Sequence, residues 1–265
     1  MISELLTYLL TPCPRYVRRM GYLYQSIALR GRYKRRKNSW QPHLDSTKAY
    51  ISEVIRSCRK RGKVIVLGSG LLLDLPVAEL SAAFDEVVLV DIVHLNEVRK
   101  QTGNYPNVRL IQADITGIAA ELFKKIIRGI AELPQGCPNI PSIDEKTDLV
   151  ISLNIISQLA AIPAEYLSTN MITRDEPAID QWCDKIRHVH YEALMGLSRP
   201  VCLIADYEFI RRDKAGIIIG QGSTVGTLSL PAPDRTWTWH IEPYGEGRPD
   251  SSKELIVGAW NIQNR

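Results

Sequence analysis

A glycine-rich turn and an acidic residue stand at the ends of two short apolar runs. Residues 64–67 and 87–90 are continuous apolar stretches, which are typical of strands buried on both faces of a parallel sheet. A Gly-Ser-Gly turn follows the first run, where glycine lets the backbone turn tightly and approach a ligand that a Cβ would block. An aspartate follows the second run, and its carboxylate can accept hydrogen bonds from both hydroxyls of a ribose. The residues that we expect to bind a nucleoside cofactor are Gly68, Ser69, Gly70 and Asp91.

Polar side chains also follow three later stretches that we expect to be strands, residues 108–112, 148–153 and 201–205. Asp114 follows the first of these runs and could contact a ligand or cap the next helix. Asn154 follows the second run and could orient a nucleophile or, again, cap a helix. Asp206 and Glu208 follow the third run on either side of a tyrosine, where they could act as general bases or pair with nearby arginines. We therefore predict Asn154, Asp206 and Glu208 as the catalytic candidates.

The histidines and cysteines do not form a metal-binding pattern. His188 and His190 are separated by one residue, which on a helix places them about 200° apart, so they are poorly placed to share one metal. The 5 cysteines contain no Cys-x-x-Cys pair, so we expect neither a zinc site nor a disulfide framework. Unpaired cysteines, the lack of a long apolar run and a start that makes a poor secretory signal favour a cytoplasmic protein.

The elements that must position these residues form an alternating series. The five apolar runs alternate with segments of helical character, as in a parallel sheet with crossover helices. The helices are expected over residues 45–60, 71–84, 117–133 and 178–197. Two late strands, residues 236–241 and 254–260, have no helix between them and predict an antiparallel hairpin. The fold class is therefore α/β, with a Rossmann-like, doubly wound sheet of about seven strands that is parallel except for this C-terminal hairpin.

The chain of 265 residues divides into a basic segment and one α/β domain. We expect residues 1–44 to form a partly helical basic arm or cap, in which residues 31–44 look like a loop or cap, and residues 45–265 to form the domain. Within the domain, residues 154–199 are longer than a simple crossover needs, so we expect them to add a lid over the carboxyl edge of the sheet.

The order of these elements and four local motifs resemble the class I S-adenosylmethionine-dependent methyltransferases. The motifs are VLGSG, VLVD, QADIT and DLVISLN, which end at Gly70, Asp91, Thr116 and Asn154. The resemblance implies that S-adenosylmethionine is the cofactor and that the glycine turn wraps its methionine part. It further implies that Asp91 binds the ribose, that Asp114 lies beside the adenine, and that the end of the fourth strand faces the methyl group and the acceptor.

Two alternatives stay open because the glycine motif departs from the family pattern. Val66 stands where the family usually has an acidic residue, and Leu72 stands where it often has a third glycine. A non-catalytic binding module with the same fold would tolerate both changes. A nicotinamide-dependent oxidoreductase is less favoured, because its glycine pattern would require glycine at Leu73 and its sheet normally finishes parallel. Methylation of a base amino group is not favoured, since Ile155 and Ile156 replace the prolines and aromatic residue of that subgroup.

The methyl acceptor, a small molecule or a macromolecule, is not indicated by any motif, but the basic segment suggests further partners. No acidic residue lies between Leu5 and Leu44, whereas nine basic residues lie within residues 15–37. This segment could bind nucleic acid through phosphates, lie on an anionic membrane, or cap the cofactor site. For the membrane alternative, the apolar stripe would be Met20, Leu23 and Ile27. The nine basic residues are Arg15, Arg18, Arg19, Arg30, Arg32, Lys34, Arg35, Arg36 and Lys37.

Overall fold

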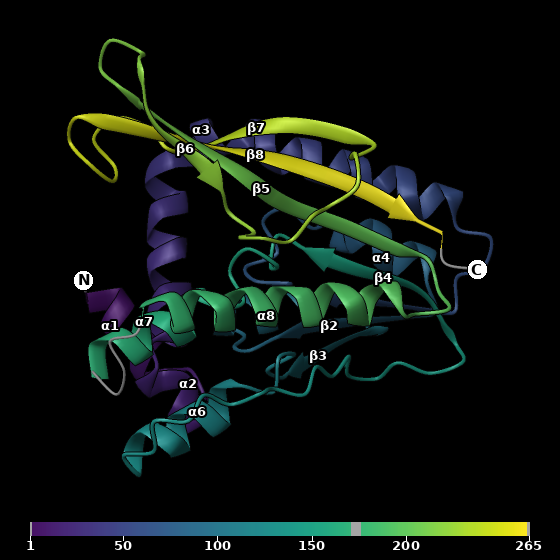
Figure 1. The fold of residues 1–265 in the computed structure, drawn as a ribbon. Coiled ribbons are helices and arrows are strands. Elements are labelled where there is room, and N and C mark those ends of the chain that lie inside the picture. Colours follow the sequence, from purple (N-terminus) through teal and green to yellow (C-terminus); the bar gives the residue numbers. More distant parts are fainter. Residues whose placement is uncertain (1, 171–175, 264–265) are drawn as a thin grey trace.

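An eight-stranded mixed sheet with helices on both faces forms the body of the protein (Figure 1). The computed structural model describes residues 2–170 and 176–263. The helices are α1 (Ile2–Leu10), α2 (Arg15–Arg19), α3 (Tyr22–Ser57), α4 (Val77–Ala83), α5 (Asn96–Thr102), α6 (Ala119–Ile127), α7 (Ala161–Asn170) and α8 (Glu176–Met195). The strands are β1 (Lys63–Leu67), β2 (Glu86–Asp91), β3 (Val108–Gln112), β4 (Thr147–Leu153), β5 (Val201–Asp213), β6 (Ile218–Ser223), β7 (Arg235–Glu242) and β8 (Ser251–Ile262).

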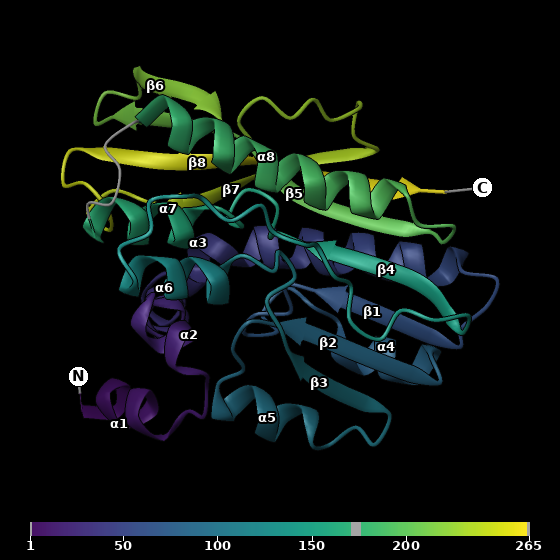
Figure 2. The same cartoon turned by 60° about the horizontal axis from the view of Figure 1, so that its bottom comes forward.

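The strand order confirms the predicted fold class. The order across the sheet is β3-β2-β1-β4-β5-β8-β7, and the neighbours from β3 to β5 are parallel (Figure 2). β8 is antiparallel to β5, and β7 is antiparallel to β8, as expected for the C-terminal hairpin. The eighth strand, β6, pairs with β5 beside this path and was not expected. Its sequence, IIGQGS, carries two glycines and is mostly exposed, so it has no buried strand pattern.

β5 is much longer than its apolar run, which corrects the predicted position of two site residues. The strand runs for 13 residues, because it keeps pairing with β8 as far as Asp213 opposite Ser251. Asp206 and Glu208 therefore lie within the strand and not at its end, on either side of a register irregularity against β8. Only the first six residues of β5 are buried, so the half-buried extension can carry polar residues.

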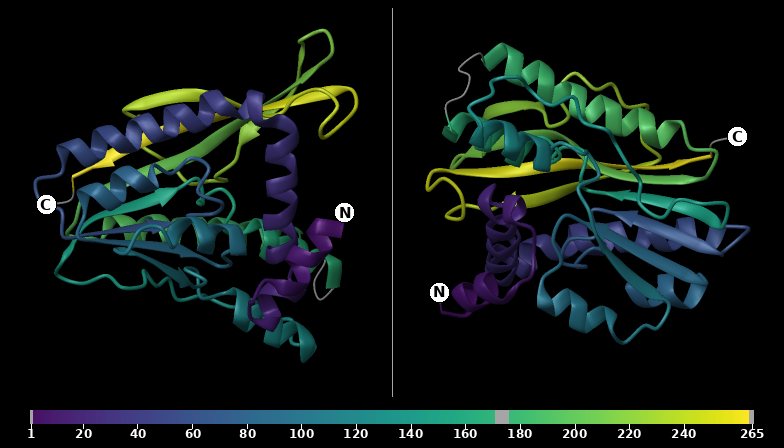
Figure 3. Two further views of the ribbon diagram at one scale, coloured as in Figure 1. Left: turned by 180° about the vertical axis from the view of Figure 1, so that it is seen from behind. Right: turned by 90° about the horizontal axis from the view of Figure 1, so that it is seen from below.

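α3 replaces the loop and the shorter helix that the sequence predicted before β1. It spans 36 residues, including the stretch from Gly31 to Leu44 that was expected to be irregular, and it breaks at Arg36 (φ −121°, ψ 22°). Figure 3 shows the two segments of this helix at a steep angle to each other. The division at residue 44 stays a prediction, and it falls inside α3. The membrane stripe of Met20, Leu23 and Ile27 is wrong, because these three side chains are buried in the protein core.

The crossover after the glycine turn is shorter than predicted. α4 begins only at Val77, after Pro76, and residues 71–76 form an irregular loop. The residue before a proline is disfavoured in helical conformation, which explains why the helix cannot begin earlier. This loop brings Leu73 and Asp74 to the carboxyl edge of the sheet.

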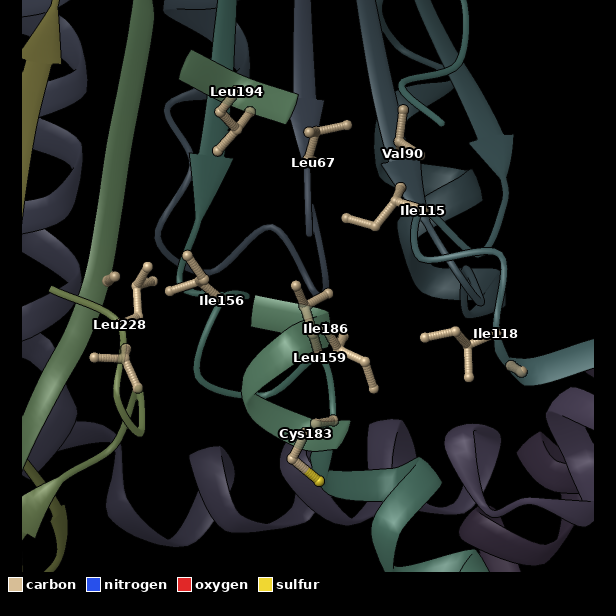
Figure 4. Packing of buried hydrophobic residues seen from close by; sticks show 14 of the residues in the cluster. Leu67, Val90, Ile115, Ile118, Ile156, Leu159, Cys183, Ile186, Leu194 and Leu228 are labelled. Carbon is tan, nitrogen blue, oxygen red and sulfur yellow. The ribbon is translucent and has the colours of Figure 1, made fainter. Parts of the chain in front are cut away.

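Successive strand residues point to opposite faces of the sheet, so a separate apolar layer packs on each face. On one face, Ile65 and Leu67 belong to a cluster with side chains of α6 and α8; Figure 4 shows Leu67 with Ile186 of α8 and with Ile118, which directly precedes α6. On the other face, Val64 and Val66 pack under α3 and α4. The predicted helix over residues 178–197 is confirmed as α8, which connects β4 to β5. The lid stays a prediction: α7 lies in the segment expected to form it, and residues 171–175 lie outside the described residues.

Within the described ranges, no helix combines the length and the apolar character that crossing a bilayer requires.

Candidate functional site

A cavity of about 650 Å³ opens at the carboxyl edge of β1, β2 and β4. Side chains along α3, from the middle of β5 and from the start of β8 also line it. Its volume lies within the range of about 300–1,000 Å³ that small-molecule sites occupy. Among the predicted site residues, those that line it are Gly68, Gly70, Asp91, Asp114, Asn154 and Asp206.

The two glycines of the turn play different structural roles. Gly68 has a φ of +81°, and a Cβ there would lie 2.8 Å from the carbonyl oxygen of Leu153 and 2.9 Å from the Cβ of Ile155. Glycine at this position is thus required by packing against the end of β4. Gly70 has a φ of +50°, and a Cβ there would have only the Gly68 carbonyl oxygen, at 3.9 Å, within contact range. The space over Gly70 is therefore open to a ligand.

Ser69 lies between these glycines but does not line the cavity. Its hydroxyl oxygen is buried and has no hydrogen-bond partner among the described residues. Its backbone amide donates to the carbonyl of Val90 at 3.2 Å, beside the amide of Gly68, which donates to the same oxygen at 2.9 Å. These two bonds tie the turn to β2 and set its distance from Asp91.

Asp91 ends β2 and faces the glycine turn. The backbone amide of Gly70 donates to its Oδ2 at 2.7 Å, and the amide of Val93 donates to its Oδ1 at 3.4 Å. Burial raises the pKa of Asp91, although these backbone amides oppose the shift. Because each carboxylate oxygen can accept a further hydrogen bond, Asp91 retains acceptor capacity toward the cavity.

Asn154 directly follows β4 and donates a hydrogen bond to a carboxylate that the sequence motifs had not assigned to the site. Its Nδ2 donates to Oδ2 of Asp74 at 2.8 Å, and its own Oδ1 is buried without a described partner. Burial raises the pKa of Asp74, which also lines the cavity. Asn154 has a φ of +48°, in the left-handed region that asparagine tolerates better than most residues. The only signal in the sequence was the presence of an acidic residue shortly after the glycine turn.

Asp114 bonds to backbone amides before and at the start of α6, and it also lines the cavity. Its Oδ1 accepts a hydrogen bond from the amide of Thr116 at 2.9 Å, and its Oδ2 accepts one from the amide of Ala119 at 2.7 Å. Asp114 therefore accepts a hydrogen bond from the first amide of α6, although the N-cap position of that helix is Ile118. Contact with an adenine stays a prediction.

The structure brings Asp206 to the cavity but not Glu208. Asp206 is buried, and its Oδ1 accepts a hydrogen bond from the hydroxyl of Ser157 at 2.7 Å. Burial raises the pKa of the Asp206 carboxyl. Glu208 does not line the cavity, and it accepts a hydrogen bond from Gln221 of β6. Its catalytic role stays a prediction that the position does not favour.

Part of the cavity wall is aromatic, formed by α3 and β7, and the sequence did not predict it. His43 of α3 stacks on Trp239 of β7, with ring centroids 4.1 Å apart, and accepts a hydrogen bond from Trp237 Nε1 at 2.9 Å. Burial lowers the pKa of His43 to about 3, so its imidazole is neutral at physiological pH. Trp40 meets Trp239 edge to face. The Trp-x-Trp strand was recognised, but its contact with α3 could not be, since residues 31–44 were expected to be a loop.

Two cations also line the cavity, namely Arg32 of α3 and Lys253 of β8. The Lys253 ammonium lies 5.4 Å from the centroid of the Phe209 ring. In the part of the chain that the structure describes, neither cation forms an ion pair. Among the same residues, no group of three or more histidine, cysteine, aspartate or glutamate side chains has the arrangement of a metal site.

Comparisons with known proteins find similar structures but no similar sequences. No protein-family model matches the chain, and no curated protein sequence matches it. DhpI in complex with SAH is 16% identical, covers 88% of this chain and 94% of its own, and has a TM-score of 0.36. The N-methyltransferase NodS from Bradyrhizobium japonicum, with 9% identity and coverages of 85% and 86%, has a TM-score of 0.38. An rRNA methylase from Streptococcus thermophilus, with 10% identity and coverages of 82% and 97%, has a TM-score of 0.35.

Proposed function

We propose that the protein binds S-adenosylmethionine in this cavity and transfers its methyl group to an acceptor. One observation carries the proposal: the Asp91 carboxylate lies at the carboxyl edge of β2, bonded to Gly70, at the wall of a cavity large enough for a nucleoside. In open α/β sheets, ligands bind outside the carboxyl ends of the strands where the strand order reverses. Here the strand order reverses between the parallel neighbours β1 and β4, and residues that follow both strands line the cavity.

The chain's own polar atoms fit this cofactor. Asp91 can accept hydrogen bonds from the two ribose hydroxyls, as its position was expected to allow. Asp74 and the unpartnered Oδ1 of Asn154 are hydrogen-bond acceptors suited to the ammonium of the methionine part. Asp74 thereby supplies a carboxylate near the turn that has Val66 in place of the usual acid. The open space over Gly70 admits the ligand backbone.

When bound, S-adenosylmethionine would supply an electrophilic methyl group on its sulfonium. The task of the protein is then to align a nucleophile with that methyl group and to exclude water. Asp206 is the residue best suited to accept a proton from the nucleophile, because its buried carboxylate reaches the cavity and its raised pKa makes it a stronger base than an ordinary aspartate. Ser157 orients this carboxylate through its hydroxyl.

The acceptor would occupy the part of the cavity next to the aromatic wall. Trp239, Phe209 and Leu255 offer apolar surface there, whereas Arg32 and Lys253 offer positive charge. This combination suits a partly apolar acceptor that carries an anionic group. The two cations are also the reason why a neutral acceptor is less favoured.

We also propose that the protein works in a reducing compartment such as the cytoplasm. All 5 cysteines are free in the structure, which is ordinary where thiols are kept reduced.

Calorimetric titration with S-adenosylmethionine, S-adenosylhomocysteine and NAD tests the proposed cofactor. We expect the first two to bind in the micromolar range and NAD not to bind. Binding of NAD alone would favour the oxidoreductase, although the antiparallel finish of the sheet argues against it. Binding of the first two without any methyl transfer to a cell extract would favour the non-catalytic module.

A further inference from the structure

The first helix of the protein turns its apolar face outward. Leu5, Leu6, Leu9 and Leu10 of α1 are 59%, 52%, 62% and 67% exposed, in contrast to the buried leucines of the core. On a helix with 3.6 residues per turn these four positions share one face, and we call this surface the leucine face. Figure 2 shows α1 at the periphery, beside α2 and the beginning of α3 and away from the sheet.

Hydrogen bonds hold the opposite, polar face of α1 against the protein. The Thr7 hydroxyl accepts a hydrogen bond from Arg30 of α3 at 3.1 Å. The carbonyls of Tyr8 and Thr11 both accept hydrogen bonds from the guanidinium of Arg18 in α2. The Glu4 carboxylate packs close to Gly31, where a Cβ would come within 3.3 Å of it. The outward direction of the leucine face is therefore set by specific contacts, and it is the reverse of the usual order for a surface helix.

We propose that the leucine face docks on an anionic phospholipid membrane. A helix that lies on such a surface buries its apolar side chains at the boundary between headgroups and acyl chains, while neighbouring cations meet the anionic headgroups. The proposal concerns α1 and its surroundings and does not depend on the cofactor.

The charges around α1 select this occupant. Arg15 and Arg19 of α2 are exposed, and each is within one turn of Arg18, which contacts α1. Lys34 of α3 is exposed and lies one turn beyond Arg30, which contacts Thr7. These three cations form no ion pair within the described ranges, so they are available to anionic headgroups. The segment from residue 5 to residue 44 contains no acidic residue, and the nearby Glu97 of α5 is paired with Arg30 at 3.2 Å.

A second copy of the chain fits the leucine face less well. Pairing two such faces would bring two basic segments together without an acidic partner. A helix of 9 residues also offers little area. Its apolar face amounts to roughly a few hundred Å², below the ~800 Å² per partner of a stable protein interface. Nucleic acid would engage the cations but would leave the four leucines in water.

Vesicle co-sedimentation of the full chain tests the proposal. We expect binding to vesicles that contain phosphatidylserine, weaker binding to phosphatidylcholine alone, and a further loss as salt is raised. The double variant Leu6→Gln/Leu9→Gln should bind at least tenfold more weakly, because it removes apolar surface but keeps helix propensity. The variant Arg15→Gln/Arg19→Gln should lose mainly the preference for phosphatidylserine and the salt dependence.

The matched control is Ile217→Gln/Ile219→Gln, which removes side chains that are 63% and 54% exposed on the hairpin between β5 and β6. It should bind vesicles as the wild type does, and all variants should keep the wild-type thermal unfolding midpoint. The proposal is overturned if the wild type does not bind vesicles, or if the control loses binding as strongly as the leucine variant. It is also overturned if the wild type binds only RNA or DNA, or if the leucine variant merely converts a dimer to a monomer in light scattering.

Discussion

The amide of Asn154 donates a 2.8 Å hydrogen bond to the carboxylate of Asp74, across the mouth of the glycine turn. The bond joins the end of β4 to the loop before α4, and both residues line the cavity. Asn154 holds this position with a φ of +48°, a conformation that costs energy for a residue other than glycine. Strain of this kind concentrates at functional sites, and here it turns the side chain toward the carboxylate that the cofactor's ammonium would meet.

Removing the Asn154 side chain should therefore weaken cofactor binding. In Asn154→Gly the backbone strain is relieved, but Asp74 loses its donor and the ammonium loses one acceptor. We expect the dissociation constant for S-adenosylhomocysteine to rise about tenfold, which corresponds to one hydrogen bond of about 1.4 kcal/mol, while the unfolding midpoint stays within a few degrees. An unchanged dissociation constant in calorimetry would show that Asn154 does not contact the ligand.

Replacing Gly68 should destabilise the fold more than replacing a glycine with equal φ elsewhere. In Gly68→Ala the new Cβ would meet the Leu153 carbonyl oxygen at 2.8 Å, whereas in Gly216→Ala, with a φ of +83°, it would meet nothing within 4 Å. The control should cost about 1 kcal/mol for its left-handed conformation, and Gly68→Ala should cost about 2–4 kcal/mol because overpacking is added. Urea unfolding measures both. If the two variants lose the same unfolding free energy, the end of β4 moves away from the new Cβ without cost.

Asp206 should lower the stability of the protein at neutral pH. Because burial raises its pKa in the folded state, its contribution is favourable below the ordinary pKa of an aspartate, about 3.9, and is lost as the pH rises through the raised value. Asp206→Asn keeps an acceptor for Ser157 and should gain on the order of 1 kcal/mol at pH 7. The gain should shrink near pH 4. A variant that is less stable than the wild type at pH 7 would contradict this account of Asp206.

His190 should make the fold sensitive to mild acid. It is buried on α8, contacts Ser152 of β4 at 3.1 Å, and burial lowers its pKa to about 4. Its folded pKa is below the unfolded value of about 6.5, so its contribution is complete above that pH and is lost as the pH falls toward 4. The expected loss is about 3 kcal/mol. His190→Gln should flatten the fall in unfolding free energy measured between these pH values.

The remaining slope in that variant should come in part from two other buried histidines: His43, whose pKa burial lowers to about 3, and His94, whose pKa burial also lowers. His188→Gln, which replaces a half-buried histidine on the same helix, is the control for the substitution itself. Identical pH dependence of His190→Gln and the wild type would show that the buried imidazole does not govern acid stability.

The sequence predicted the centre of the sheet better than its extensions. β1, β2, β4 and the start of β5 are short, mostly apolar runs, and their burial on both faces makes them recognisable locally. The length of β5 depends on pairing with β8, whose partner residues lie about fifty positions further along the chain. Because this pairing is not visible locally, the sequence predicted Asp206 at the end of a strand. It did predict that Asp206 belongs to the site, and Asp206 lines the cavity.

The wall formed by α3 was not predictable for a different reason. The stretch before Trp40 is strongly basic and carries no continuous apolar stripe, so it looks like a loop. It becomes a helix because Trp40 donates a hydrogen bond to the carbonyl of Ile241 at 3.1 Å and His43 stacks on Trp239 of β7. These contacts join residues about two hundred positions apart, and no local pattern reports them. The residues assigned to the cofactor all lie at or shortly after the end of a strand, and this local position is what made them predictable.

The binding of S-adenosylhomocysteine by the wild type and by Asp91→Ala, measured side by side in calorimetry, tests the central claim most directly. We expect micromolar binding by the wild type, and a loss of at least a hundredfold in the variant because two hydrogen bonds from the ribose disappear. Urea unfolding should show that the variant is folded. No binding by the wild type, or equal binding by a folded Asp91→Ala, would contradict the assignment of this cavity to S-adenosylmethionine.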